Sequence, residues 1–279
     1  PVAVPSQDMV LGIYYLTLEK PGDKGEGMFF KDVNEALLAY ENHIITLQAP
    51  IKVRRTGIVG GEEVTRVVSS TLGRFIFNEG IPQDLGYVDR ENRDNDLVPE
   101  INFLVAKKQL KQIIDKCIHT HGATKTAEVL DYIKATGYKY STITVSISDM
   151  TVPEAKKELL ASAEATISKI TAQYRRGLVT DEERYKAVIE TWKQTDDQLT
   201  KALLDGLDKY NNIYMMADSG ARGSNQQIKQ LAGMRGLMAD TSGRIIELPI
   251  KSNFREGLDV LEYFISAHGA RKGMSDTAL

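Results

Sequence analysis

Few side chains in this sequence combine the types and spacing that conventional catalysis or metal binding requires. Cys117 is the only cysteine, and there are four histidines: His43, His119, His121 and His268. On a strand, His119 and His121 would share a face and could supply two zinc ligands, but the pair stands at the end of an expected helix, directly before Gly122. A lone cysteine on a helical segment is more often a small core residue than a nucleophile. The residues therefore predict neither an active site of the chain's own nor a metal site.

The acidic stretch 89–96 comes nearest to a cation-binding loop. Its spaced carboxylates resemble a calcium loop, but the glycine and the terminal glutamate that an EF-hand needs at fixed offsets are missing. The surrounding residues, 83–99, are polar and lack apolar periodicity. We therefore expect a solvated loop and assign it no role.

Arg222 is the best candidate for contact with an anion. It lies in the small-residue run 217–224, directly before an expected helix whose capping box is Ser224 with Gln227. Free backbone N–H groups and the helix dipole favour a phosphate at such a position. The alternative is a tight turn in which Arg222 pairs with a carboxylate such as Asp218, and the residues alone favour this alternative. The spacings of a Walker loop and of a dinucleotide-binding fingerprint are absent.

The last segment, residues 252–279, has a helical pattern that begins at Asn253. Each glycine inside a helix costs about 1 kcal/mol relative to alanine, yet three interrupt the pattern: Gly257, Gly269 and Gly273. Either the helix ends near His268, or a continuous helix is softened where another chain approaches its backbone. A local positive site for phosphates would come from the neighbouring Arg271 and Lys272.

Composition bounds the class of protein. The chain has 279 residues, 42% of them hydrophobic and 26% charged, and a formal net charge of −3. It is long enough for one large or two smaller globular domains, and its charge predicts only local contacts with nucleic acid. No apolar run approaches the ~20 residues that span a bilayer, and residues 1–5 carry no secretion signal. With its single cysteine, we expect a cytoplasmic protein with no membrane partner.

The elements expected before residue 150 form a mixed α and β unit. The apolar run 8–17 is consistent with a buried helix or strand, which periodicity cannot distinguish. Helical spacing predicts helices over 32–40, 107–118 and 124–136, and alternation predicts strands over 51–55, 64–68 and 141–148. We therefore expect a first domain over residues 1–150 and place the whole chain in the α+β class.

A helical hairpin is expected over residues 151–210. Gly177 is placed to end the first helix, and Thr180 with Glu183 forms a capping box for the second. Apolar residues recur three or four positions apart in two narrow stripes: Leu159, Ala163, Thr166, Ile170 and Tyr174, then Tyr185, Val188, Trp192, Leu199 and Leu203. Because the other faces are charged, we expect an antiparallel pair that projects into solvent, where it could dock other proteins.

Several segments resemble the β′ subunit family of bacterial DNA-directed RNA polymerases. One specific match, together with 230–238, resembles the family's F-loop: Met215-Met216-Ala217-Asp218-Ser219-Gly220-Ala221-Arg222-Gly223-Ser224. Another, together with 253–258, resembles the first part of the bridge helix: Tyr263-Phe264-Ile265-Ser266-Ala267-His268-Gly269-Ala270-Arg271-Lys272-Gly273. Further matches follow in the family's order: 4–15, 71–74 with Asn78 and Pro82, 177–180 and 183–185. The resemblance covers essentially the whole chain.

The resemblance implies an internal fragment with four parts: a mixed α/β secondary-channel (pore) domain over 1–150, antiparallel coiled-coil rim helices over 151–210, the F-loop segment over 211–251 and the N-terminal part of the bridge helix over 252–279. It implies a nucleotidyltransferase that makes RNA on a DNA template from ribonucleoside triphosphates. Its magnesium-binding aspartate motif would lie upstream of this chain, so the fragment alone would be inactive. The implied partners are the β, α, ω and sigma subunits, DNA and RNA, and Gre-type secondary-channel factors.

The resemblance also implies roles for individual residues. Arg222 matches the F-loop arginine that approaches the phosphates of the incoming nucleotide. The bridge-helix positions near the template strand match His268, Arg271 and Lys272, and a bending point of that helix matches Gly273. Factor docking falls at the tip of the rim helices: Arg175, Arg176, Thr180, Asp181 and Arg184. No catalytic residue or metal ligand is implied. The alternative is a free-standing protein whose hairpin docks partners and which has no nucleotide chemistry.

Overall fold

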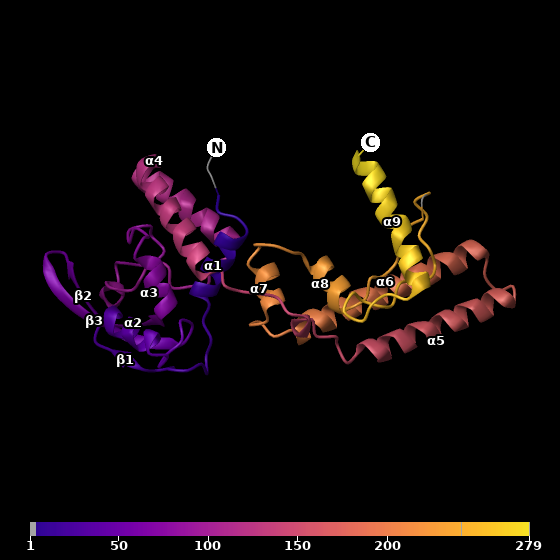
Figure 1. The fold of residues 1–279 in the computed structure, drawn as a ribbon, viewed down its shortest axis with the longest axis horizontal. Helices are drawn as coiled ribbons and strands as arrows, with labels where there is room; N and C mark the ends of the chain where they lie inside the picture. Colours follow the sequence, from indigo (N-terminus) through magenta and orange to yellow (C-terminus); the bar gives the residue numbers. More distant parts are fainter. Residues whose placement is uncertain (1–3, 241, 279) are drawn as a thin grey trace. The chain divides into compact units, whose positions relative to one another are not determined.

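The computed structural model describes residues 4–240 and 242–278, except for seven side chains in the last helix: His268, Ala270, Arg271, Lys272, Ser275, Asp276 and Ala278. The chain divides into two compact units, Pro1–Thr144 with Met215–Arg222, and Val145–Tyr214 with Gly223–Leu279. The described residues form helices and a three-stranded sheet (Figure 1), which confirms the α+β class.

The helices of the first unit are α1 (Asp8–Thr17), α2 (Val33–Glu41), α3 (Leu72–Asn78) and α4 (Lys107–Tyr140). Helix α1 settles the choice that the apolar run 8–17 left open, and most of its side chains are buried. It packs on α4 so closely that a Cβ built on Gly12 would lie 1.9 Å from the carbonyl oxygen of Gly137. The two helix backbones therefore touch at a pair of glycines, and α1 lies at the centre of the core.

The sheet has the order β1 (Phe29–Phe30), β2 (Pro50–Val59) and β3 (Glu62–Thr71). Strands β2 and β3 are antiparallel, which confirms and lengthens the two strands predicted there. Gly60 and Gly61 join them with φ values of +59° and +92°. A two-residue hairpin turn of type I′ needs positive φ at both positions, and glycine adopts it without strain. Ile51 and Val53 of β2 are buried in the core of the unit.

Helix α4 joins the two helices predicted over 107–118 and 124–136. The backbone leaves helical geometry only at Gly122, where φ is +75° and ψ is −177°. The glycine was therefore a correct sign of a break, but the chain resumes a helix at once instead of forming a loop.

The strand predicted over 141–148 is wrong. The alternating Val145 and Ile147 are exposed, and the segment ends in a short 3₁₀ helix, η2 (Ile147–Asp149), which Ser146 caps. Alternation alone could not decide this, because a strand also needs a partner with which to pair.

The second unit contains the predicted hairpin of α5 (Lys156–Arg175) and α6 (Asp181–Gly206), which lie side by side in Figure 1. Gly177 follows α5 with a φ of +73°, and Thr180 with Glu183 forms the capping box of α6, so both predicted signals are confirmed. The seam between the helices buries Ala163, Val188 and Trp192.

Other parts of the second unit cover one side of this seam. Met234 and Leu237, after α8 (Asn225–Ala232), pack on the same apolar cluster as Trp192. The chain from 235 to 252 then doubles back on itself through two β-bridges, Gly236 with Ile250 and Ala239 with Ile245. The hairpin stripes thus carry a third layer that the sequence pattern did not indicate.

The last helix, α9 (Val260–Ala278), begins seven residues later than predicted. Asn253 and Glu256 do form a capping exchange, since Asn253 Oδ1 accepts a hydrogen bond from the Glu256 N–H (2.8 Å). Gly257 then takes a φ of +85° and ends the turn. Gly269 and Gly273 lie inside α9, so the continuous helix, one of the two alternatives, is the correct one.

Candidate functional site

The loop that carries Arg222 is fixed within the first unit. It follows α7 (Asn212–Asp218), and the Asp218 carboxylate accepts a hydrogen bond from the hydroxyl of Tyr14 on α1 (2.8 Å). The carbonyl of Ser219, which is fully buried, accepts a second hydrogen bond from the N–H of Lys107 at the start of α4 (2.9 Å). Two helices of the core therefore set the position of the loop.

Arg222 stands at the end of this loop with an exposed side chain. Its N–H donates to the carbonyl of Met216 (3.2 Å). Its guanidinium forms no hydrogen bond or ion pair with any residue that the structure describes, and Tyr14 engages the Asp218 carboxylate instead. The expectation that Arg222 is a turn residue held by Asp218 is therefore wrong. A free guanidinium on a fixed loop is suited to bind an oxyanion through two parallel hydrogen bonds.

Helix α8, in the second unit, has the predicted capping box, in which the Gln227 side chain accepts a hydrogen bond from the Ser224 N–H (3.0 Å). An ion pair that the sequence did not indicate ties α8 to α6: Lys229 Nζ lies 2.6 Å from Asp196 Oδ2. Burial raises the pKa of Asp196, against the opposing effect of Lys229. The other oxygen of Asp196 is buried and accepts no hydrogen bond from a described residue. The ion pair thus links α8 to α6, although burial of the Asp196 carboxylate opposes its charged form.

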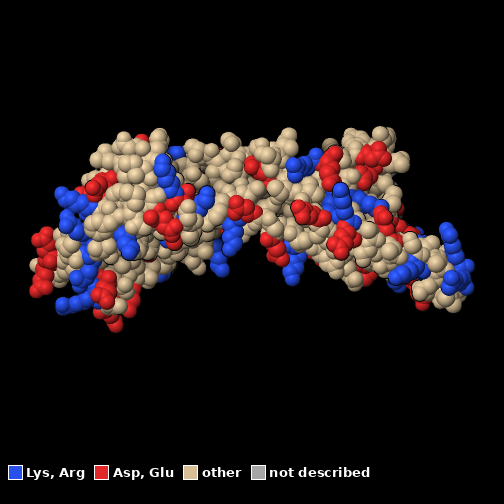
Figure 2. Space-filling model, turned by 90° about the horizontal axis from the view of Figure 1, so that it is seen from below, with Lys and Arg blue, Asp and Glu red and all other residues tan. Residues whose placement is uncertain are grey.

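The hairpin tip presents two free cations among the described residues. Arg175 and Arg176 are exposed and form no ion pair with any described residue, and Leu178 beside them is 69% exposed. Basic side chains gather at this end of the hairpin in Figure 2, whereas acidic and basic side chains alternate over the rest of that face. The tip therefore presents two positive charges beside the exposed apolar side chain of Leu178, a combination typical of surfaces that dock proteins.

Arg184, unlike Arg175 and Arg176, forms ion pairs with neighbouring carboxylates. It forms a bidentate pair with Glu247 (2.6 and 3.0 Å) and further hydrogen bonds with Asp181 (3.0 and 2.8 Å). Its guanidinium also lies 5.3 Å from the ring centroid of Tyr174. These hydrogen bonds, those of Glu247 foremost, raise the pKa of Arg184. Arg184 thus braces the tip, together with Asp181.

Thr180 is also part of the tip's construction. Both its N–H and its hydroxyl donate to Glu183 Oε2 (2.8 Å each). The backbone hydrogen bond, with the hydroxyl's, lowers the pKa of Glu183. Of the five predicted docking residues, three therefore build the tip and two, Arg175 and Arg176, have free charges.

The predicted template-strand residues lie on α9, but the side chains of His268, Arg271 and Lys272 are outside the described residues. Gly273 is exposed, and a Cβ added there would meet no described atom within 4 Å. Gly269 differs, because a Cβ there would lie 2.9 Å from the terminal methyl of Met238. Of these two glycines, only Gly273 is therefore free to accept a side chain without a clash with a described atom.

No group of three or more histidine, cysteine or acidic side chains in the described part of the chain could hold a metal ion. His119 and His121 have separate partners, the carbonyl of Asp115 (2.6 Å) and the carboxylate of Asp84 (2.7 Å). Cys117 is fully buried, as expected for a core residue. Among the helices described here, none is long and apolar enough to cross a membrane.

The acidic stretch 89–96 is a loop that contains one short turn, η1 (Arg93–Asn95). Arg90 organises it, because its guanidinium donates to the carbonyls of Asn95 (2.6 Å) and Asp96 (3.0 Å) and pairs with the buried Glu100 (3.2 Å). Arg90 therefore fixes the loop.

Comparison with known proteins shows which family the chain belongs to. The family described as RNA polymerase Rpb1, domain 3, matches residues 1–150, and that described as RNA polymerase Rpb1, domain 4, matches residues 179–255. The chain belongs to the RNA polymerase Rpb1 family. It is 72% identical to the DNA-directed RNA polymerase subunit beta′ of Lachnoclostridium phytofermentans, 61% to that of Clostridium acetobutylicum and 59% to that of Acetivibrio thermocellus. Each alignment covers 100% of this chain and 22%, 24% and 24% of the relative, respectively.

The resemblance to bacterial β′ that the sequence motifs carried is thus confirmed. The chain spans less than a quarter of the length of these Rpb1-family relatives. The domain 4 match runs from the hairpin tip through α8 and ends at Arg255, before α9 begins. The ion pair of Lys229 with Asp196 lies inside this match. The sequence gives no local sign of this contact, because the two residues lie 33 positions apart.

Proposed function

We propose that this chain is part of the largest catalytic subunit of a bacterial DNA-directed RNA polymerase, where it forms the rim of the secondary channel and part of the wall of the active centre. The observation that carries the proposal is the 59–72% identity with beta′ subunits along the entire chain. The assembled enzyme would make RNA on a DNA template from ribonucleoside triphosphates. No observation favours the alternative of a free-standing docking protein over this one.

The four parts proposed from the resemblance are the pore domain (1–150), the rim helices (151–210), the F-loop segment (211–251) and the start of the bridge helix (252–279). The magnesium ions of the assembled enzyme would be held outside this chain, which alone would be inactive. The β, α, ω and sigma subunits, DNA and RNA would be its partners, in the cytoplasm.

Arg222 is proposed to contact the phosphates of the incoming nucleotide. Its support is twofold: the guanidinium is exposed without a described partner, and the loop that carries it is hydrogen-bonded to α1 and α4. A fixed loop reduces the entropy that binding would otherwise cost.

Factor docking is proposed for the hairpin tip, with separate roles for the predicted residues. Arg175 and Arg176 would contact an acidic surface of a Gre-type factor, since their charges are free. Thr180, Asp181 and Arg184 would act indirectly, because their side chains hold the tip in shape. On α9, we propose that the positions of His268, Arg271 and Lys272 lie near the template strand in the assembled enzyme and that Gly273 lets the helix bend.

The proposal is tested by exchange of segments. In a beta′ subunit that is 72% identical over the aligned region, this chain replaces the matching segment, and the assembled polymerase is assayed for templated RNA synthesis. We expect synthesis to be retained. A chimera that assembles with the other subunits but makes no RNA on a template would contradict the proposed function.

The role of Arg222 is tested in the same assembled enzyme. Arg222→Ala should raise the nucleotide concentration needed for half-maximal elongation by about 10- to 100-fold, because one charge-assisted contact is lost. High nucleotide concentration should restore part of the rate. Arg176→Ala is the matched control and should leave the concentration dependence unchanged. An Arg222→Ala enzyme with the concentration dependence of the parent would remove the phosphate contact from the proposal.

A further inference from the structure

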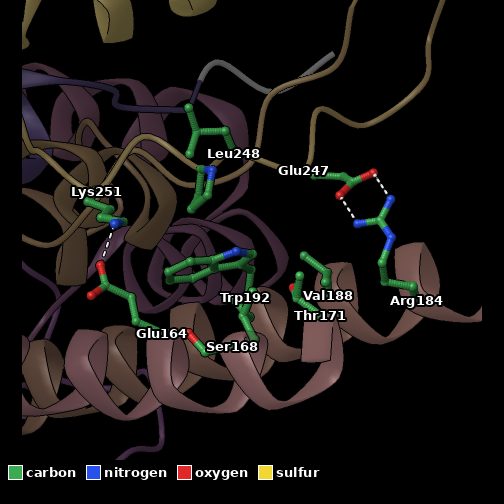
Figure 3. Close-up of a pocket in the computed structure, with 11 residues that line it drawn as sticks. Glu164, Ser168, Thr171, Arg184, Val188, Trp192, Glu247, Leu248 and Lys251 are labelled. Atoms are coloured by element: carbon green, nitrogen blue, oxygen red, sulfur yellow. Dashed lines mark hydrogen bonds and ion pairs between the residues drawn. The ribbon is translucent and has the colours of Figure 1, made fainter. Parts of the chain in front are cut away.

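A pocket of about 460 Å³ opens in the second unit between α5, α6 and the extended segment 247–251. Figure 3 shows its walls: Glu164, Ser168 and Thr171 come from α5, Val188 and Trp192 from α6, and Leu248 lies across from them. Its volume falls within the range of sites that bind small organic molecules. Neither Arg222 nor the free cations of the tip, Arg175 and Arg176, line this pocket.

The floor of the pocket is apolar. Trp192 and Val188 line it from the hairpin seam, where both side chains are almost completely buried. Leu248 and Pro249 line it from the opposite segment, and Leu248 is 56% exposed at its edge. A planar apolar group placed between these side chains would remove the exposed part of Leu248 from water, which favours binding.

Two ion pairs brace the pocket at opposite ends (Figure 3). Arg184 pairs with Glu247 at one end, and Lys251 pairs with Glu164 at the other. The ammonium of Lys251 also lies 5.7 Å from the ring centroid of Trp192. Both pairs connect segment 247–251 to the hairpin, so they fix this segment relative to α5 and α6. Because the two positive and two negative charges are mutually paired, the pocket offers no free charge to a ligand.

Two hydroxyl groups supply polarity without charge. Ser168 and Thr171 line the pocket from α5, and neither hydroxyl forms a hydrogen bond with a described residue. Thr166 on the same helix differs, since its hydroxyl donates to the carbonyl of Ser162 (3.0 Å) and it does not line the pocket. A ligand with a hydrogen-bonding group at its edge could bond to Ser168 and Thr171, which water otherwise reaches, while its body covers the apolar floor.

We propose that this pocket binds a small, uncharged aromatic molecule that carries a hydroxyl or a similar polar group at its edge. The apolar floor favours the aromatic body of the ligand, and the two hydroxyls of α5, those of Ser168 and Thr171, favour its polar edge. A charged ligand is disfavoured, because it would have to break one of the two ion pairs to find a partner of opposite charge.

Trp192 makes the proposal directly measurable, because it is the only tryptophan of the chain and lines the pocket. The probe is 4-nitrobenzyl alcohol, a neutral aromatic alcohol whose nitro group quenches indole fluorescence. Two probes of nearly the same shape provide the charge controls, the anion 4-nitrobenzoate and the cation 4-nitrobenzylamine. In the 279-residue chain, we expect saturable quenching by the alcohol, with an affinity at least roughly tenfold higher than for either charged probe.

Two substitutions on α5 separate a built site from incidental contact. Thr171→Phe fills the pocket and should abolish saturable quenching, whereas Thr166→Phe, on the same helix outside the pocket, should leave it intact. Should Thr171→Phe perturb the hairpin, the milder pair Ser168→Ala and Thr171→Val should each weaken the alcohol by roughly fivefold, the effect of losing one neutral hydrogen bond. Thr166→Val is the control for that pair.

Three outcomes would overturn the proposal. Quenching that rises linearly with probe concentration, without saturation, would show collision and no site. Equal affinities for the three probes, or a preference for a charged one, would contradict the selection against charge. Binding by both Ser168→Ala and Thr171→Val that equals binding by Thr166→Val would show that the alcohol binds without the two hydroxyls of α5.

Discussion

In the first unit, helices α1 and α4 meet backbone to backbone, whereas in the second unit α5 and α6 meet through long side chains. A Cβ on Gly12 would lie 1.9 Å from the Gly137 oxygen. The hairpin seam has no such contact and is filled instead by Trp192, Val188 and Leu199. Two ion pairs flank the hairpin seam, Arg184 with Glu247 and Lys251 with Glu164, and each joins a hairpin helix to segment 247–251.

The difference shows two ways of fixing a helix pair. A glycine contact sets the separation of two helices by the hard radii of backbone atoms, so even one methyl group disturbs it. A seam of large side chains sets the separation less strictly, because the side chains can repack, but it loses much apolar burial when one is removed. The first unit should therefore be sensitive to added volume and the second to lost volume.

The largest effect is expected from adding volume at the glycine contact. Gly12→Ala should lower the stability of the first unit by at least about 3 kcal/mol, because the new methyl group meets a backbone carbonyl that cannot rotate away. Hydrogen exchange of the α1 and α4 amides at increasing urea measures this. Gly206→Ala in α6 is the control: its Cβ would meet no described atom within 4 Å, and it should stabilise its helix slightly. Equal effects of the two substitutions would contradict the glycine contact.

Removing volume from the hairpin seam should have a similar, somewhat smaller effect. Trp192 is 4% exposed, and Trp192→Ala should cost about 3 kcal/mol, at the low end for a large aromatic because the pocket beside it already offers room for relaxation. The free energy of opening, measured by hydrogen exchange of the α5 and α6 amides at increasing urea, tests this. An unchanged stability would mean that the seam assigned to these helices is not the one that holds them.

The buried ion pair between α6 and α8 ranks next. Lys229→Met keeps the length of the side chain but leaves the Asp196 carboxylate unpaired, which should cost about 2 kcal/mol at neutral pH. Burial already raises the pKa of Asp196, and the loss of Lys229 should raise it further. A raised folded-state pKa gives stability at low pH that is lost as pH rises through that pKa. The variant should therefore approach the parent on acidification, and Asp196→Asn in the Lys229→Met background should remove that pH dependence. Parallel pH profiles for the parent and Lys229→Met would contradict this.

Local signals in the sequence were sufficient where one short segment decides the structure. The capping box of Thr180 with Glu183, the helix end at Gly177 and the break at Gly122 all depend on neighbouring residues, and all three are confirmed. The late start of α9 also has a local sign, since Asp259 with Glu262 repeats the pattern of Asn253 with its glutamate. The first pattern does not start the helix, because Gly257, which follows it with positive φ, allows only one turn.

Contacts between distant segments could not be predicted. The strand expected over 141–148 does not form, because no strand among the described residues lies beside it, and alternation within the segment cannot reveal this. The roles of the arginines depend on partners far along the chain. Glu247, 63 residues away, pairs with Arg184, and Tyr14, 204 residues from Asp218, hydrogen-bonds the carboxylate that Arg222 could otherwise pair with. The family resemblance named these residues, but only their contacts distinguish a free charge from a brace.

The division among the tip arginines predicts two different consequences of alanine substitution. Arg184→Ala should lower hairpin stability by about 1 kcal/mol, because its pairs with Glu247 and Asp181 are partly exposed to solvent. Arg176→Ala should leave stability unchanged and weaken only the binding of a factor. Thermal unfolding measures the first effect, and affinity for a Gre-type factor in the assembled polymerase measures the second. A destabilised Arg176→Ala protein would show that this arginine also braces the tip.

The smallest effect is expected at Gly273, and it has the opposite sign. An exposed glycine inside a helix weakens it, so Gly273→Ala should stabilise α9 by about 0.5–1 kcal/mol, since the added methyl group meets no described atom. Gly269→Ala is the matched control in the same helix. There the methyl group would press on Met238, which should offset the gain from helix propensity. Hydrogen exchange of the α9 amides should slow in the first variant and change less in the second.

In the assembled polymerase, a stiffer helix should alter elongation speed even at saturating nucleotide, because the bending of the helix has changed and no binding contact has. Unaltered elongation by a Gly273→Ala enzyme whose α9 exchange has slowed would show that the glycine is not needed for bending.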